Sequence, residues 1–361
     1  MSQQPLLVIL NDTAVIPHHG CKVVMKRIVD FFGERGYRMV TVSVYSDWHI
    51  YEDIVAEATA VIVNGEGTIH HSAPRGKVLT EVAPFCRERG IPVFLVNSVW
   101  QDNSDEMAQN ARAFDRVWVR ESFSHKQLAA RGVEASTVAD LTVGWAYGRS
   151  TPAPLRSGTV FTDAVGMPVT DQLHSLAQAN PESRFVTLTP PPGSRGEYGL
   201  YEFERLRPRW RMFFLRTLRS KVIRFIKLAL IVRGKLIYRS RLARGTLEEY
   251  AINDFMGLLE RTQLVVTGRF HVVCLCLVTG TPFIAVASNS HKIEGMLHDA
   301  GLIDRIVSSS QLDQWLRSPA PWTDAHTRAA REFVESATRA QEDMFETIHR
   351  HIGESAKREG A

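Results

Sequence analysis

The sequence of 361 residues has no apolar run close to the roughly 18 residues that a membrane-spanning helix needs. Its beginning, MSQQPLLVIL, turns polar at Asn11 and Asp12, so we expect no secretion signal. Cysteine is scarce, and the four cysteines are Cys21, Cys86, Cys274 and Cys276. We expect them to be reduced and structural in a cytoplasmic protein, which argues against a secreted, disulfide-built fold.

Acidic residues are missing from one long segment. Between Arg205 and Arg244 there are 14 Lys and Arg residues and no Asp or Glu. This leaves 29 of the 43 basic residues elsewhere, against all 39 acidic residues. The protein is therefore an acidic body that carries one strongly basic segment, and this asymmetry is more informative than the net charge of +4.

The same segment is also apolar, with a helical spacing of three or four between apolar residues from Leu215 to Ala229. We predict a basic amphipathic helical insertion, residues 203–244, that binds an anionic membrane surface. The residues expected at that surface are Trp210, Phe213, Arg216, Arg219, Arg224 and Lys227. A partner protein or self-association into a homo-oligomer is the alternative. Nucleic acid is disfavoured, because the apolar face is large and the rest of the chain is acidic.

Apolar strand-like runs alternate with helical patterns along the rest of the chain, which predicts parallel βαβ units. Expected strands of the first half cover residues 6–10, 38–45, 58–65, 91–98, 116–121 and 134–141. The fold class is α/β, with two Rossmann-like domains and a cleft between them. The expected divisions are a first domain at 1–145, a linker at 146–158, a second domain with the insertion at 159–322, and a C-terminal helix at 323–361.

Ligands of such sheets bind outside the carboxyl ends of the strands, so polar residues at the expected strand ends are the candidate site. In the first half these residues are Asn11, Asp12, His18, His19, Gly65, Glu66, Gly67, Asn97, Ser98 and Arg120. In the second half they are Arg269, Phe270, His271, Ser288, Asn289 and Lys292. Glycines beside Glu66 would let a ligand approach the backbone closely, and a following helix N-terminus would favour an anion.

Each candidate also has a simpler explanation. Arg120 and Glu121 could form an ordinary surface ion pair, and Glu66 could cap a helix. The histidine pairs 18/19 and 70/71 are not at the usual ligand spacing, so we expect no metal site. Arg269 ends a buried strand with no Asp or Glu nearby in the sequence, so its partner is either a ligand anion or a carboxylate distant in the sequence.

Several stretches together resemble the polysaccharide pyruvyl transferase family. They are VIVNGEGTIHH, PVFLVNSVW, RVWVRES with the later AD, and VVTGRFH followed by GTPFIAVASNSHKIEGMLHDAGL. They occur in the family's order over residues 5–145 and 245–310, whereas residues 203–244 have no counterpart. The resemblance implies a fold similar to the two-domain glycosyltransferases called GT-B. It also implies transfer of pyruvate from phosphoenolpyruvate to a sugar as a cyclic ketal.

The resemblance implies that Arg120 and Arg269 bind the donor and that His271 is the acid or base. Two guanidinium groups suit the carboxylate and phosphate of phosphoenolpyruvate. We expect Gly65, Gly67, Phe270, Ser288, Asn289 and Lys292 to help bind this donor. Glu66 is expected to orient or deprotonate an acceptor hydroxyl. The acceptor-side candidates are Asn11, Asp12, His18, His19, Asn97 and Ser98. No metal or resident cofactor is expected, because phosphoenolpyruvate is itself a co-substrate.

Two other functions stay open at this point. One is a GT-B glycosyltransferase that uses a nucleotide sugar, although no acidic pair in the second half is placed to hold a ribose. The other is a non-catalytic, membrane-bound scaffold for polysaccharide assembly. In the first reading we expect a lipid-linked saccharide acceptor, in envelope polysaccharide synthesis, at the inner face of the cytoplasmic membrane.

Overall fold

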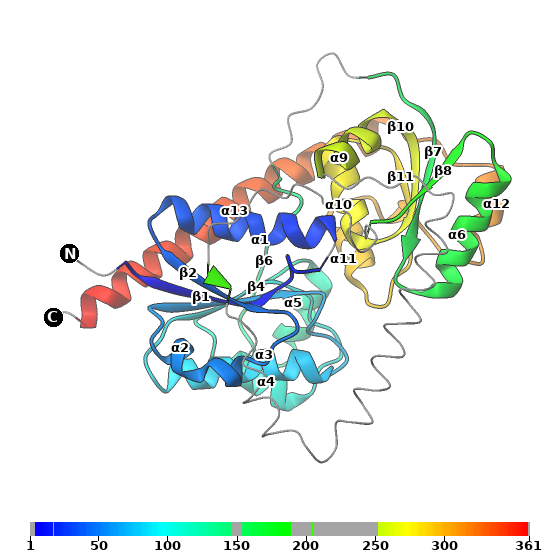
Figure 1. Ribbon diagram of the computed structural model, residues 1–361. Coiled ribbons are helices and arrows are strands. Elements are labelled where there is room, and N and C mark those ends of the chain that lie inside the picture. Colours follow the sequence, from blue (N-terminus) through cyan, green and yellow to red (C-terminus); the bar gives the residue numbers. More distant parts are fainter. Residues whose placement is uncertain (1–3, 17, 146–153, 189–203, 206–251, 360–361) are drawn as a thin grey trace.

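A computed structural model describes residues 4–16, 18–145, 154–188, 204–205 and 252–359. It contains two parallel β-sheets, each with helices on both faces (Figure 1). The predicted class, α/β with two Rossmann-like domains, is confirmed. The residues predicted to lie at a membrane surface fall outside the described part: Trp210, Phe213, Arg216, Arg219, Arg224 and Lys227.

The N-terminal domain is built on a seven-stranded sheet in the order β6-β5-β4-β3-β1-β2-β9. Its strands are β1 (Leu6–Asp12), β2 (Arg38–Ser43), β3 (Ala60–Glu66), β4 (Val93–Ser98), β5 (Arg116–Val119), β6 (Ser136–Thr137) and β9 (Glu204–Arg205). Its helical elements are α1 (His19–Glu34), η1 (Trp48–Tyr51), α2 (Glu52–Ala56), α3 (Pro74–Arg87), α4 (Asp105–Ala111) and α5 (Ser122–Ala129). Alternate residues of β1 face opposite layers: Leu7 packs in the core with α1, and Val8 in the core with α3 and α4.

The C-terminal domain has a five-stranded sheet in the order β12-β11-β10-β7-β8. Its strands are β7 (Ser157–Ala164), β8 (Ser183–Val186), β10 (Thr262–Gly268), β11 (Phe283–Val286) and β12 (Ile306–Val307). Its helical elements are α6 (Met167–Ala179), α9 (Ile252–Arg261), α10 (Phe270–Thr279), α11 (Lys292–Asp299), η2 (Ile303–Arg305) and α12 (Leu312–Arg317). Helix α10 is buried along its whole length, so the run with Cys274 and Cys276 is a core helix.

Both sheets reverse their strand order at one place, which is where Rossmann-like folds bind ligands. In the first sheet the reversal lies between β1 and β3, and in the second it lies between β7 and β10. The carboxyl ends of these four strands carry Asn11, Glu66, Asp163 and Gly268. The topology therefore places the candidate site at two reversal points, one in each domain.

The last helix, α13 (Asp324–Glu359), belongs to both hydrophobic cores and runs along both domains (Figure 1). Its Ala330 and Ala337 pack with helices α9 and α10 of the C-terminal domain. Further along, Phe345 and Ile348 pack with α1 and the first sheet. Between these two parts, the Gln341 side chain donates to the backbone oxygens of Ala139 and Asp140. The helix thus joins the two domains through apolar contacts and a buried amide.

Two details differ from the sequence prediction. Only residues 136–137 of the expected strand at 134–141 form a strand, at the edge of the sheet, and the buried residues 138–141 leave the sheet. Glu204 and Arg205, which we assigned to the insertion of the second domain, pair with β2 of the first sheet. Among the described residues, no helix is both long and apolar enough to cross a bilayer.

Candidate active site at the domain junction

Three strands of the first sheet end in residues with a left-handed backbone. Asn11, Glu66 and Asn97 have φ angles of 66°, 43° and 56°. Side chains other than glycine seldom adopt this region, and such strain gathers at functional sites. Amide side chains stabilise it: Asn11 Nδ2 donates to the Asn64 oxygen at 2.7 Å, and Asn97 Oδ1 accepts from Leu141 N at 3.1 Å. The strand ends are therefore held in a fixed, uncommon shape.

His271 lies in the first turn of α10, directly after β10. Its Nε2 is 3.6 Å from Glu66 Oε1 and 3.6 Å from Asp140 Oδ2, which are too long for hydrogen bonds. Nε2 and Glu66 Oε1 are both buried without a hydrogen-bond partner. The imidazole thus sits between two carboxylates of the other domain, a setting suited to proton transfer. Glu66 ends β3 and does not cap α3, which begins at Pro74.

Arg120 and Glu121 are not a surface ion pair, so that simpler explanation is wrong. Arg120 is 1% exposed, and its Nη1 donates to Asp140 Oδ2 at 2.8 Å. Its Nε and Nη2 are buried without a partner, and its Cζ lies 4.4 Å from the centre of the Phe270 ring. Burial alone would raise the pKa of Asp140, but His271 and Arg120 together hold it well below its usual range. The guanidinium therefore keeps donors available beside a fixed carboxylate.

Arg269 has a partner that is distant in the sequence. Its Nε donates to Asp163 Oδ2 at 2.9 Å, and its Nη2 also contacts this oxygen. Of the two partners expected for Arg269, a ligand anion or a carboxylate distant in the sequence, the structure shows the carboxylate. Asp163 is itself fixed, because its Oδ1 accepts from Leu188 N at 3.2 Å.

A third cation, Lys292, opens α11 and is 8% exposed. Its Nζ donates to Asn289 Oδ1 at 2.6 Å, and Ser288 Oγ donates to the same oxygen. Burial first, then the nearby charges of Arg120 and Arg269, lower the pKa of Lys292 to about 7. The two arginines therefore lower the proton affinity of Lys292.

Most acceptor-side candidates are buried, and their side chains contact other protein groups near the strand ends. Asp12 accepts from Thr41 Oγ1 and Ala14 N, both at 2.9 Å. His19 stacks on Phe255 with ring centres 5.0 Å apart, and Ser98 donates to its neighbour's backbone oxygen. His18 differs, because it is half-buried and caps α1.

The two glycines expected to help bind the donor differ in their surroundings. Glycine is needed at position 65, where a Cβ would lie 2.9 Å from Ser98 Cα. Gly67 is exposed.

Sequence reasoning missed the carboxylates that pair the two arginines. Asp140 is the end of the AD stretch, which was noted without a role, and Asp163 follows an ordinary strand pattern. Both pairings join segments far apart in the chain, 20 and 106 residues respectively. A buried arginine at a strand end demands a carboxylate, but the sequence does not say which one.

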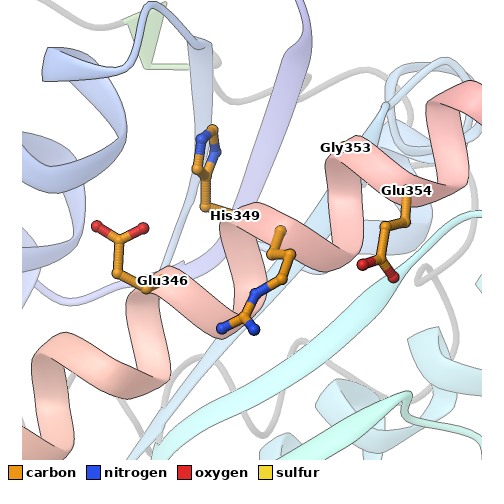
Figure 2. Close-up of a pocket in the computed structure, with 5 residues that line it drawn as sticks. Glu346, His349, Gly353 and Glu354 are labelled. Carbon is orange, nitrogen blue, oxygen red and sulfur yellow. The ribbon is translucent and has the colours of Figure 1, made fainter.

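A separate hollow near the C-terminal end of α13 is not a good candidate. It is lined by Glu346, His349, Arg350, Gly353 and Glu354 (Figure 2). Its Glu346 pairs with Arg35, and His349 Nδ1 is 2.8 Å from the Tyr37 hydroxyl. It belongs to one helix surface, away from the strand ends of both sheets.

Two Rossmann-like domains that meet at the carboxyl ends of their sheets define the GT-B fold, and solved structures bear this out. UDP-GlcNAc 2-epimerase from Neisseria meningitidis, bound to UDP-GlcNAc, is 11% identical, with 96% of this chain and 100% of that chain covered and a TM-score of 0.52. Trehalose 6-phosphate synthase from Burkholderia multivorans is 12% identical, with 99% of each chain covered and a TM-score of 0.51. These likenesses concern the fold alone.

The family is settled by a second comparison. The family model for polysaccharide pyruvyl transferase matches residues 18–290, and the chain belongs to this family. The matched range contains Arg120, Arg269 and His271, whereas β1 and Lys292 lie just outside it. No curated protein matches the chain.

Proposed function

We propose that the protein transfers pyruvate from phosphoenolpyruvate to a sugar, as a ketal. The observation that carries this proposal is that Arg120, Arg269 and Lys292 follow the carboxyl ends of β5, β10 and β11, and that His271, two residues after Arg269, lies between Glu66 and Asp140. Family membership supports pyruvyl transfer, and the three cations support an anionic donor. Phosphoenolpyruvate, with its carboxylate and phosphate, is the donor that fits this charge.

The donor would bind at the junction, where two helices begin. Helix α10 starts directly after Arg269, and α5 starts two residues after Arg120. Backbone N–H groups at a helix N-terminus favour an anion. The two unpartnered nitrogens of Arg120 supply further donors. Because Asp140 and Asp163 already balance the arginines, Lys292 is the group that would adjust its charge to the donor.

The chemistry would begin with protonation of the donor's methylene carbon by His271, which makes C2 electrophilic. One sugar hydroxyl adds to C2 and a second displaces phosphate, so that two C–O bonds form and one C–O bond to phosphate breaks. Of the two hydroxyl protons, one replaces the proton given to the methylene carbon and the other leaves with phosphate. Glu66 lies on the first-domain side of His271, where it would accept a hydroxyl proton.

The acceptor would approach from the N-terminal domain. Next to Asn11 there is a pocket of about 230 Å³, whose lining includes Tyr45, Asp47, Trp48 and Arg75. Tyr45 is 74% exposed, and Arg75 Nε donates to Asn11 Oδ1 at 3.2 Å. A flat ring beside charged side chains suits a saccharide. We further propose that this saccharide is lipid-linked, because the basic segment 203–244 would bring the protein to an anionic membrane surface.

Calorimetric titration with phosphoenolpyruvate, UDP and GDP tests this function. We expect phosphoenolpyruvate alone to bind. Because the free Lys292 amine has a pKa of about 7, a bound dianion should draw a proton onto it at pH 8. Titrations in buffers of different ionisation enthalpy should therefore show proton uptake, and binding should weaken as the pH rises above 7.

The variant Lys292→Met should lose this proton uptake and bind at least about tenfold more weakly. The control is Lys77→Met, whose Nζ pairs with Glu106 on the surface. Binding of UDP or GDP in place of phosphoenolpyruvate would favour the nucleotide-sugar alternative. Binding of none of the three would favour the scaffold.

A further inference from the structure

Three side chains with metal-binding atoms meet where α1 touches α10. One nitrogen each of His18 and His271, together with Cys21 Sγ, lie within 4.8 Å of one another. His18 and Cys21 begin α1 in the first domain, and His271 begins α10 in the second. Among the described residues, this is the one group of three such atoms. The adjacent histidine pairs gave no reason to expect it, because the third ligand is a cysteine three residues on.

The local packing holds these side chains together. A Cβ on Gly20, between His18 and Cys21, would lie 2.5 Å from His271 Cβ, so only glycine lets the helices approach this closely. The His18 and His271 rings meet edge to face with centres 5.0 Å apart. Zinc binds sulfur at about 2.3 Å and nitrogen at about 2.0 Å, so its ligand atoms lie roughly 3.5 Å apart. Closing the observed spacing, at most 4.8 Å, to this value needs a shift of up to about 1.3 Å.

A second observation points to a ligand at the same place. His271 Nε2 and Glu66 Oε1, 3.6 Å apart, are buried without a hydrogen-bond partner. Buried polar atoms are normally paired, and unpaired ones call for an explanation such as an ion. Two imidazoles, a thiol and a carboxylate are a set that zinc accepts.

We propose that His18, Cys21 and His271 bind one Zn²⁺ ion between the two domains, and that the Glu66 carboxylate, which lies outside this group of three atoms but 3.6 Å from His271 Nε2, moves in as the fourth ligand. Burial and the Glu66 charge raise the pKa of the Cys21 thiol, so the free protein holds a neutral thiol that the metal must deprotonate. A metal on His18 Nδ1 would replace the hydrogen bond that Cys21 N donates to this atom, which is long at 3.3 Å and weak. The bound Zn²⁺ ion links the first domain to the second.

The site can be tested by titrating the full-length, metal-free protein with Co²⁺, a spectroscopic substitute for zinc. We expect one equivalent to produce a thiolate-to-cobalt charge-transfer band that one equivalent of Zn²⁺ abolishes. Cys21→Ser should lose the band, whereas Cys86→Ser, which changes a buried thiol under the other face of the sheet, should keep it. Circular dichroism would confirm that both variants fold.

A more conservative variant removes one ligand and keeps the local structure. In His18→Asn the new side chain can still cap α1, because asparagine is a good N-cap residue, but the imidazole ligand is gone. We expect its affinity for Co²⁺ to fall by more than about tenfold. The absence of a band in the wild-type protein, or its persistence in Cys21→Ser, would overturn the proposal. A band lost equally in Cys86→Ser would do the same.

One consequence rests on the proposed function. A metal on His271 and Glu66 removes both groups from proton transfer, so Zn²⁺ should inhibit phosphate release from phosphoenolpyruvate, and Cys21→Ser should relieve the inhibition. The cobalt spectrum does not depend on any turnover. A band without inhibition would therefore refute the proposed role of His271 while leaving the metal site intact.

Discussion

At the scale of single residues, the junction combines cations with resident carboxylates. Arg120 is paired by Asp140 and Arg269 by Asp163, and both acids are almost fully buried. A buried guanidinium without a counter-charge would be very costly, whereas these pairs stay ionised and leave further donors free. The arginines can thus bind an anion and still keep their carboxylate partners after the anion leaves.

We predict that Asp140→Asn strongly destabilises the protein. The change leaves Arg120 as a buried charge without its partner, a loss of about 3–5 kcal/mol in the free energy of unfolding. Urea denaturation of the variant and the wild type would measure it. The double variant Arg120→Met with Asp140→Asn should recover part of the loss, and a double variant that is no more stable than Asp140→Asn would contradict the argument.

The same pair sets a pH dependence. The pKa of Asp140 is lower in the folded protein than in the unfolded chain, where it is about 3.9. Its contribution to stability is therefore complete above that value and is lost as the pH falls below it, because the unfolded chain then takes up a proton that the folded carboxylate does not. Asp140→Asn should reduce the loss of stability between neutral pH and acid.

The limits of sequence reasoning show at this scale. Two arguments predicted four site residues, Glu66, Arg120, Arg269 and His271. They follow expected strands, and they lie in stretches that resemble the family's motifs. Their partners do not, because Asp140 and Asp163 reach the site through pairings that depend on how two sheets are placed. The burial of Asp12 and His19 was equally invisible, since a polar residue after a strand can face a ligand or the core.

At the scale of elements, the site depends on the contact between the starts of α1 and α10. The alternation of strand-like runs with helical patterns predicted helices between the strands, because local propensity and burial agree there. The close approach of two helices from different domains depends on tertiary packing. Its only sign in the sequence is Gly20.

We predict that Gly20→Ala disables the enzyme. The added methyl group would overlap the His271 ring, so α1 and α10 must separate or the imidazole must move. A displacement of about 1 Å at a catalytic group costs on the order of 100-fold in rate. Phosphate release from phosphoenolpyruvate in the presence of the acceptor would measure it.

The matched control is Gly353→Ala, a glycine of α13 whose Cβ would meet nothing within 4 Å. It should leave the rate unchanged and increase stability by up to about 1 kcal/mol, because alanine favours helix. Equal rates in Gly20→Ala and Gly353→Ala would show that the close contact has no catalytic importance.

At the scale of the whole molecule, charge is divided between an acidic body and the basic segment 203–244. We predict that deleting residues 206–244, which spares the β9 pairing of Glu204 and Arg205, abolishes binding to vesicles with anionic lipid. Sedimentation with phosphatidylglycerol vesicles would measure this, and binding of the full chain should weaken as salt is added.

Replacement of the segment by a Gly/Ser linker of equal length is the control for chain connectivity. Its binding of phosphoenolpyruvate should equal that of the full chain, because none of the three junction cations lies in the segment. Undiminished vesicle binding after the deletion would reject the membrane role and favour a partner protein.

Helix α13 makes the two domains one cooperative unit. Since its first half completes one core and its second half completes the other, neither domain can unfold without uncovering apolar surface on the helix they share. Heating should therefore melt the protein in a single transition although it has two sheets. The same arrangement means that exchanging domains with a relative requires a junction inside the helix, between Ala337 and Met344, so that each half of it keeps the core it evolved with.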